Sequence, residues 1–372
     1  MFNVKTMTYG YDDISIRPSD RSFVRHRSQC VTMKGNNLPI FTAPMSTVID
    51  ERNYSIFSKN HIIPILPRNI DMATRNEYLL DGKWVAYSLS EFDSMIRKND
   101  RFDNTVHVLI DIANGNMDAI FRLCEIAKKK YGKDGIVLMT GNIANPETYK
   151  YCCHAGIDFV RCGVGGGCGC LTTSNTGIHY GIVNLLSEIY EMKKSYEPSG
   201  DIACVTKVIA DGGIRNYTDV IKALALGADY VMIGSVLSRL VESCAKTYAY
   251  DKNGKTVYID TLKNGTSVRE SEDGFTITDS NGIYGYDRLY KVFYGMSSKK
   301  GQEDLFGKKK GTSEGTEKHL ECTTNIDKWT KNMNDYLSSA MSYCDIDNIN
   351  DFNPDNVDTF IMSPNLINSI NK

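Results

Sequence analysis

The sequence has no long apolar run and no excess of positive charge, and these absences exclude several classes of protein. No stretch approaches the roughly 20 apolar residues that cross a bilayer, and the opening residues MFNVKTMTYGYDD lack the apolar segment of a signal peptide. Lysine and arginine number 43 against 45 acidic residues, so the chain carries no electrostatic footprint for nucleic acid. We therefore expect a cytoplasmic protein that acts on small molecules and contacts neither membrane nor nucleic acid.

Two common nucleotide-binding signatures are also missing. The chain has no Walker A sequence, and its one approach to G-x-G-x-x-G, at 163–168, ends in cysteine where the third glycine belongs. The 11 cysteines are an odd number, which without an export signal favours reduced thiols over a disulfide framework. An open, doubly wound sheet is thereby disfavoured, but it stays the alternative architecture.

What the chain does contain is a repeated alternation of short apolar runs and amphipathic segments. Eight runs have the nearly continuous apolar character of parallel strands that are covered on both faces, at 38–44, 62–66, 84–88, 106–112, 135–141, 158–163, 207–213 and 229–235. Helical periodicity recurs between them at 116–131, 145–155 and 217–226. Eight such alternations predict an α/β fold, a single (β/α)8 TIM barrel domain over 1–372.

Three regions depart from this alternation. Residues 247–287 alternate apolar and polar side chains around N-G and D-G turns, which predicts a β-hairpin insertion. Residues 298–326 are rich in lysine, glycine, glutamate and threonine with little periodicity, which predicts a mobile flap. The remainder, 327–372, is predicted to form a helix to Tyr343 and then a weakly ordered tail rich in asparagine and aspartate.

Polar residues and glycines gather where the predicted strands end. They include Asp111, Asn114, Asn142, Arg161, Asp211, Gly213, Gly234 and Ser235. Any one of them could serve only to turn the chain. Because the carboxyl ends of barrel strands form the active-site face, their repetition at strand after strand predicts a site there.

The segment GVGGGCGCLTT at 163–173 is the most informative part of the chain. Its glycines allow close approach of the backbone to a ligand, and successive N–H groups suit a phosphate. Cys170 could act as a nucleophile once deprotonated, with the Thr172 hydroxyl as a proton relay. Two alternatives stay open: a plain buried thiol, and a zinc site that combines neighbouring cysteines with His154 but lacks a C-x2-C pair.

Nine segments resemble the IMP dehydrogenase/GMP reductase family. They occur in the family's order and extend over nearly the whole chain. They are YDDISIRPS (11–19), PIFTAPMSTV (39–48), DIANGNM (111–117), GNIANPE (141–147), GVGGGCGCLTT (163–173), IADGGIR (209–215), ALGADYVMIGS (225–235), FYGMSS (293–298) and SSAMSYC (338–344). The resemblance implies a homotetrameric TIM barrel in which a cysteine attacks C2 of a purine nucleotide. The reductase branch fits better, since 298–326 lacks the dehydrogenase Arg-Tyr pair and the strands before Val106 leave no room for regulatory CBS modules.

The resemblance also assigns roles by position. It implies catalytic roles for Cys170, Thr172, Glu314 and Arg68. It implies substrate contacts at Met45, Asn142, Cys168, Asp211, Gly213, Gly234, Ser235, Tyr294, Gly295, Met296, Ser297 and Gly315. NADPH would contact Asp111, Ala113, Asn114 and Arg161. Backbone carbonyls of Gly163, Gly165 and Cys170 would hold a monovalent cation, K⁺.

The implied reaction is the NADPH-dependent reductive deamination of GMP to IMP and ammonia, through a covalent purine intermediate on Cys170. Three departures from the family pattern bear on it. Cys168 occupies the position of the phosphate-loop serine, and a thiol forms weaker hydrogen bonds than a hydroxyl. Arg68 occupies the position of a lysine and is harder to deprotonate. Gly311 occupies the position of an arginine. Three alternatives therefore stay open: a reductase of deoxy- or modified guanine nucleotides, an IMP dehydrogenase, and a catalytically inactive nucleotide-binding protein.

Overall fold

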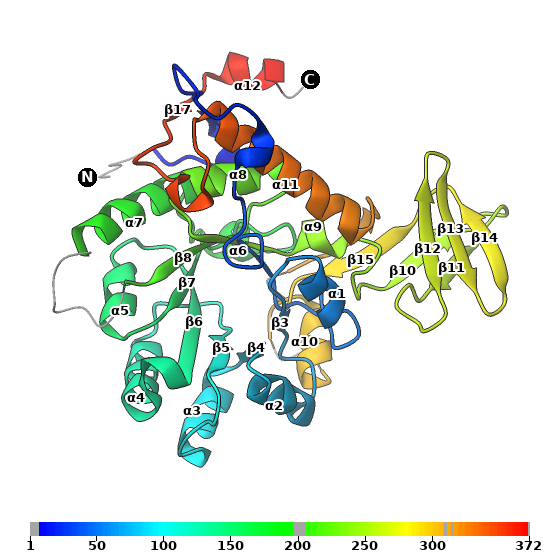
Figure 1. Cartoon of the computed structure of the whole chain (residues 1–372). Coiled ribbons are helices and arrows are strands. Elements are labelled where there is room, and N and C mark those ends of the chain that lie inside the picture. The colour runs from blue at the N-terminus through cyan, green and yellow to red at the C-terminus, as the bar shows by residue number, and fades with distance from the viewer. Residues whose placement is uncertain (1–6, 197–204, 309–310, 314, 371–372) are drawn as a thin grey trace.

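Eight parallel strands form one nearly closed barrel in the computed structural model, which describes residues 7–196, 205–308, 311–313 and 315–370. The strands are β2 (Ile40–Thr42), β3 (Ile65–Leu66), β4 (Trp84–Tyr87), β5 (Val106–Ile110), β6 (Ile136–Ile143), β7 (Phe159–Cys162), β8 (Lys207–Asp211) and β9 (Tyr230–Ile233). They pair in the order β2-β9-β8-β7-β6-β5-β4-β3, and a parallel bridge between Phe41 and Ile63 joins the two ends. The predicted TIM barrel is confirmed (Figure 1). Seven strands lie within their predicted apolar runs, and β6 continues two residues beyond its run of 135–141.

Helices surround this barrel. They are α1 (Tyr54–Lys59), α2 (Met72–Leu80), α3 (Leu89–Lys98), α4 (Asp118–Gly135), α5 (Thr148–His154), α7 (Ile182–Tyr196) and α8 (Tyr217–Ala225), with the short α6 (Thr172–Thr176) and α9 (Ser235–Ser238) at strand ends. The three predicted helices are confirmed, although α5 begins later than expected because Asn145 caps a preceding turn by accepting the Glu147 N–H. None of the described helices combines the length and apolar character needed to cross a membrane.

Alternation along the strands separates two apolar cores. Side chains that face the barrel interior form one cluster, which includes Phe41, Ile65, Trp84, Leu109, Met139, Phe159, Ile209 and Met232. Their sequence neighbours, such as Val108, Val160 and Val208, face outward and pack with the helices in a larger cluster. Because strand side chains point alternately to opposite faces, both faces are apolar, which explains the continuous apolar runs.

The predicted hairpin insertion is confirmed and projects from the side of the barrel (Figure 1). Its strands are β10 (Thr247–Tyr250), β11 (Thr256–Ile259), β12 (Ser267–Ser271), β13 (Gly274–Asp279) and β14 (Gly282–Tyr286). The last three form an antiparallel meander, while β10 pairs with both β11 and β15 (Tyr290–Tyr294). Phe275 and Ile277 pack with Val241, Ala249 and Leu289 in a separate small core at its base.

The region predicted as a flap contains more regular structure than its composition indicates. It holds α10 (Lys299–Phe306) and β16 (Glu317–Glu321), and β16 pairs antiparallel with β15. Ser298 caps α10 by accepting the Gly301 N–H at 3.0 Å, and the Gln302 amide donates to the carbonyls of Ser297 and Thr312. Both elements are short, so neither produces a periodic pattern that sequence reasoning can detect.

The C-terminal part also differs from expectation after its helix. The predicted helix is confirmed as α11 (Ile326–Tyr343), but the residues that follow are packed against the barrel. The strand β17 (Thr359–Ile361) pairs with β1 (Ile14–Ile16), and Phe352 and Val357 are buried. The remaining short helices are α12 (Pro364–Ile370) and the 3₁₀ turns η1 (Tyr11–Asp13), η2 (Arg27–Gln29) and η3 (Ile349–Asp351).

Candidate active site

Strand alternation delivers charged side chains to one end of the barrel. Leu109 and Ile209 face the interior, and the residue two positions after each, Asp111 and Asp211, follows the same face to the strand end. Arg161 continues the inward series of β7 in the same way after Phe159. The interior is thus apolar at mid-barrel and ionic at the carboxyl end of its strands, as the sequence predicts.

These three residues form one network around Arg161, which is only 8% exposed. Its Nη1 lies 2.8 Å from Asp111 Oδ1 and its Nε lies 2.9 Å from Asp211 Oδ2. Burial opposes the charge, but the two carboxylates prevail and raise the pKa of the Arg161 guanidinium. Arg68 adds a second cation, with Nε 3.3 Å from Asp111 Oδ2. Two anions and two cations therefore fix each other at this end of the barrel.

Asp211 is held from a second side by Asn142. The Asn142 amide donates to Asp211 Oδ2 and to the Gly163 carbonyl, each at 2.8 Å. One side chain thus ties β8 to the start of the cysteine loop. An aspartate fixed by two donors is pre-organised, so it loses little freedom when it binds a ligand.

The cysteine loop after β7 depends on glycine at two positions. Gly163 has φ +127° and Gly165 has φ +78°, conformations that side chains rarely adopt. A Cβ on Gly163 would overlap the Asp211 carbonyl oxygen, and one on Gly165 would overlap Thr173 Oγ1. The backbone therefore passes closer to β8 and α6 than any other residue allows.

Cys170 lies at the end of this loop beside the start of α6. Its Sγ lies 3.2 Å from Thr172 Oγ1. Cys170 also forms an antiparallel bridge with Gly315, and the Thr316 N–H donates to the Gly169 carbonyl at 3.0 Å. Glu314 lies outside the described residues. Its neighbour Gly315 nevertheless brings the predicted flap against the cysteine loop.

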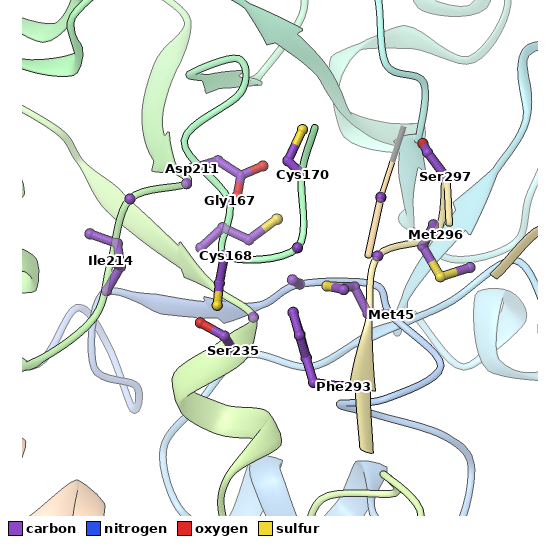
Figure 2. A pocket seen from close by; sticks show the side chains of 18 residues that line it. Met45, Gly167, Cys168, Cys170, Asp211, Ile214, Ser235, Phe293, Met296 and Ser297 are labelled. Atoms are coloured by element: carbon purple, nitrogen blue, oxygen red, sulfur yellow. The ribbon is translucent and has the colours of Figure 1, made fainter. Parts of the chain in front are cut away.

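One cavity lies next to Cys170 and matches most of the predicted substrate positions (Figure 2). The predicted residues that line it are Met45, Cys168, Cys170, Asp211, Gly213, Gly234, Ser235, Gly295, Met296, Ser297 and Gly315. Sequence reasoning missed Ala43, Gly167, Gly169, Gly212, Ile214, Met232 and Phe293. Ala43 and Met232 could have been found by extending the inward alternation of β2 and β9 to the strand ends.

A second cavity meets the first at Cys170. It is lined by Arg68, Asp111, Ala113, Asn142, Arg161, Gly163, Gly165 and Thr172, and it shares Met45, Cys170, Asp211, Met296 and Ser297 with the first. Of the predicted catalytic and cofactor positions, Arg68, Cys170, Thr172, Asp111, Ala113 and Arg161 line the second cavity. Most predicted substrate positions line the first, but Asn142, which was predicted to contact substrate, lines only the second. Cys170 is thus placed where ligands in the two cavities could meet.

Two predicted site residues lie elsewhere. Neither Tyr294 nor Asn114 lines either cavity. The Tyr294 hydroxyl instead donates to Asp304 Oδ2 at 2.6 Å, and burial raises the pKa of this phenol. Asn114 is exposed, and its Oδ1 accepts the Asn116 N–H. The position of Tyr294 follows from the alternation of side chains along β15. Its neighbour Phe293 points towards the cavity, so Tyr294 points away from it.

The alternative zinc site is not assembled in the described part of the chain. There, no three His, Cys, Asp or Glu side chains gather as a metal site. Cys162 faces the outer core, and burial raises the pKa of its thiol. Cys168 and Cys170 lie at the barrel mouth instead. No disulfide joins the ten cysteines that the structure describes.

Comparison with known proteins agrees with this geometry. Residues 8–363 match the model of the IMP dehydrogenase / GMP reductase domain. The chain is 31% identical to the GMP reductase of Exiguobacterium sp. over 256 residues, which cover 65% of this chain and 74% of the relative. It is 27% identical to the GMP reductase of Bacillus subtilis over 373 residues, which cover 97% and 98% of the two chains. This chain belongs to the IMP dehydrogenase/GMP reductase family.

Proposed function

We propose that this protein is an NADPH-dependent GMP reductase, which converts GMP to IMP and ammonia through a covalent intermediate on Cys170. One observation carries the proposal: Cys170 lines both cavities, with the Thr172 hydroxyl 3.2 Å from its sulfur. A nucleophile shared by two cavities suits a reaction in which one bound molecule must react with another. The relatives named GMP reductase supply the substrate class.

The first step is the exchange of the amino group for sulfur. The Cys170 thiolate attacks C2 of the purine, the C2–Sγ bond forms, and the C2–N bond breaks. The thiol proton and the two amino hydrogens leave together as ammonia, so atoms and charge balance. Thr172 Oγ1 is close enough to carry this proton from sulfur towards nitrogen. Glu314, which the family pattern pairs with this threonine, would complete the relay.

The second step restores the thiolate. The second cavity would hold NADPH, which when bound would supply the hydride that C2 receives. The C2–H bond forms as the C2–Sγ bond breaks, which yields IMP and a thiolate that recovers its proton through Thr172. Arg68, Asp111, Ala113 and Arg161 line the region where the reductant would bind. Their network is internally paired, so it offers a rigid polar surface with little net charge.

The first cavity suits a nucleotide in one orientation. Met296 and Ser297 lie at the Cys170 end and would contact the base, while Asp211 would accept hydrogen bonds from the ribose hydroxyls. Gly213, Gly234 and Ser235 line the first cavity outside the part that it shares with the second. Small residues there expose backbone N–H groups, which suit a phosphate. Asp211 thus favours a ribonucleotide over a deoxyribonucleotide.

The cysteine loop also suits the proposed K⁺ ion. Gly163, Gly165 and Cys170 all line the second cavity, and both glycines adopt positive-φ conformations. Backbone carbonyls are the ligands that replace the hydration shell of K⁺. Such an ion would hold the loop in shape. We expect activity to fall when K⁺ is replaced by a bulky organic cation, and unchanged activity would remove the ion from the proposal.

We further propose a cytoplasmic homotetramer, as the family resemblance implies. The free thiols of the described residues fit a reducing compartment. Light scattering coupled to gel filtration measures the assembly directly, and a monomeric mass at assay concentration would contradict the tetramer.

The deciding experiment compares wild type with Cys170→Ala. Wild type should oxidise one NADPH for each IMP and ammonia formed from GMP, while the variant should bind GMP without turnover. Absence of turnover by the intact protein would overturn the proposal. The same assay with dGMP tests the deoxynucleotide alternative, and IMP with NAD⁺ tests the dehydrogenase alternative. A purine adduct at Cys170, detected by mass spectrometry, would contradict an inactive binding protein.

A further inference from the structure

Lys318 lies beside Cys168, a residue that lines the first cavity. On the paired strands β15 and β16, Phe293 lies directly opposite Lys318. Residues directly opposite each other in an antiparallel pair project to the same face of the sheet. Phe293 lines the first cavity. Lys318 therefore extends over the same side of the sheet, at the border of this cavity.

A direct contact places the lysine head at the cysteine loop. Lys318 Nζ lies 3.6 Å from Cys168 Sγ, as donor to acceptor. Cys168 lines the cavity, and Figure 2 shows its side chain in the same part of the cavity as Ser235. The loop also packs on β15, because a Cβ on Gly169 would lie 3.1 Å from the Phe293 ring. Strand register and loop packing thus agree on where the ammonium group lies.

The charge on Lys318 has no acidic partner within the described residues. The ion pairs found there include Lys328 with Glu270 and Arg288 with Glu321, but none that involves Lys318. Among the described residues, Asp211 is the only carboxylate that lines the first cavity, and it is already paired with Arg161. A phosphate dianion bound beside Cys168 and Ser235 would otherwise meet only neutral groups. Lys318 is the cation placed to offset that charge.

We propose that Lys318 binds the 5′-phosphate of the nucleotide, together with the backbone around Cys168. The inference rests on the proposed function, because it takes a nucleotide to occupy the first cavity. It assigns to β16 a task for which the family pattern uses a serine hydroxyl in the cysteine loop. A thiol is a weak hydrogen-bonding group, whereas an ammonium group gives a charge-assisted bond to phosphate. Lys318 thereby makes the site select nucleotides over nucleosides.

Calorimetric binding of GMP and of guanosine to Lys318→Met tests the assignment without requiring turnover. We expect the Kd for GMP to rise at least tenfold, the Kd for guanosine to stay within twofold, and Lys318→Arg to recover most of the loss. Lys331→Met removes an exposed lysine from α11 and should change neither value. In turnover assays, Lys318→Met should raise KM for GMP and leave kcat within about threefold.

A second substitution separates a phosphate contact from a structural one. Cys168→Ser restores a hydroxyl to the loop, so in the Lys318→Met background it should recover part of the affinity for GMP and none for guanosine. Equal loss of both ligands in Lys318→Met, or unchanged GMP binding, would overturn the inference while GMP turnover by wild type keeps the proposed function. Wild type that binds GMP without turning it over would refute the proposed function alone. Wild type that binds no GMP would refute both.

Discussion

Arg161 Nε lies 2.9 Å from Asp211 Oδ2, where β7 and β8 end side by side at the mouth of the barrel. The same guanidinium binds Asp111, which directly follows β5, so one buried cation joins the ends of three strands. Asp211 lines both cavities and Asp111 lines the second. Arg161 thus sets the geometry of both cavities without lining the first.

Arg161→Met should destabilise the fold by about 3–5 kcal/mol, because it leaves two carboxylates without their buried partner. KM for GMP should also rise, since Asp211 loses one of the groups that position it. Denaturant unfolding and steady-state kinetics measure the two effects. Arg97→Met is the matched control, because its ion pair with Asp93 is exposed and should contribute less than about 1 kcal/mol. Equal effects of the two variants would contradict the role of Arg161.

Thr172→Val should lower kcat by about 10²–10⁴-fold, the usual contribution of a positioned proton donor or acceptor. The substitution preserves the shape of the side chain and removes the hydroxyl beside Cys170 Sγ. GMP binding should change less than about threefold. Thr172→Ser keeps a hydroxyl and should retain most of the activity. Ser174→Ala is the control, because that hydroxyl donates to the Leu171 carbonyl within the same turn. A kcat for Thr172→Val close to that of wild type would show that Thr172 is not a proton relay.

Gly163→Ala should abolish GMP binding and turnover while the barrel still folds. The new Cβ would overlap the Asp211 carbonyl, so the start of the cysteine loop must move away from β8. Circular dichroism should stay close to that of wild type, since the strands themselves are unaffected. Gly285→Ala in β14 is the matched control, because within the described residues no heavy atom beyond its chain neighbours lies within 4 Å of its Cβ position. Activity should be unchanged. A fully active Gly163→Ala would show that the close approach is dispensable.

Lys291 on β15 should make stability depend on alkaline pH. Burial lowers the pKa of its ammonium group to about 8, against about 10.4 in an unfolded chain. Between these values the unfolded chain binds a proton that the folded protein does not, so the free energy of unfolding should increase as pH rises. Lys291 should thereby increase the free energy of unfolding by about 3 kcal/mol across that pH interval.

Lys291→Met isolates this contribution, because all other titrating groups are common to both proteins. The difference in unfolding free energy between wild type and variant should change steadily from pH 8 to pH 10.5 and be flat below pH 8. Urea unfolding at each pH measures it. A pH-independent difference would mean that Lys291 titrates normally in the folded protein.

The sequence predicted the parts of the molecule that local patterns determine. Each barrel strand is buried on both faces, so its apolar run reports it directly, and Asp111 and Asp211 follow from the position where such runs end. Phe293 and Lys318 could not be found in this way. Their placement depends on the register between β15 and β16, which is set by pairing across the predicted flap. The family resemblance assigned Tyr294 to the site, whereas its neighbour Phe293 lines the first cavity.

The base of the insertion has a consequence for how this part of the chain can vary. β10 and β15 pair through Thr247 with Lys291 and Tyr248 with Tyr290, so the hairpins between them begin and end at adjacent points. Lengthening or shortening a loop closed at its base costs little additional entropy. The hairpins can therefore diverge freely in evolution. A shift of β15 by a single residue, by contrast, would turn Phe293 away from the cavity and bring Tyr294 towards it.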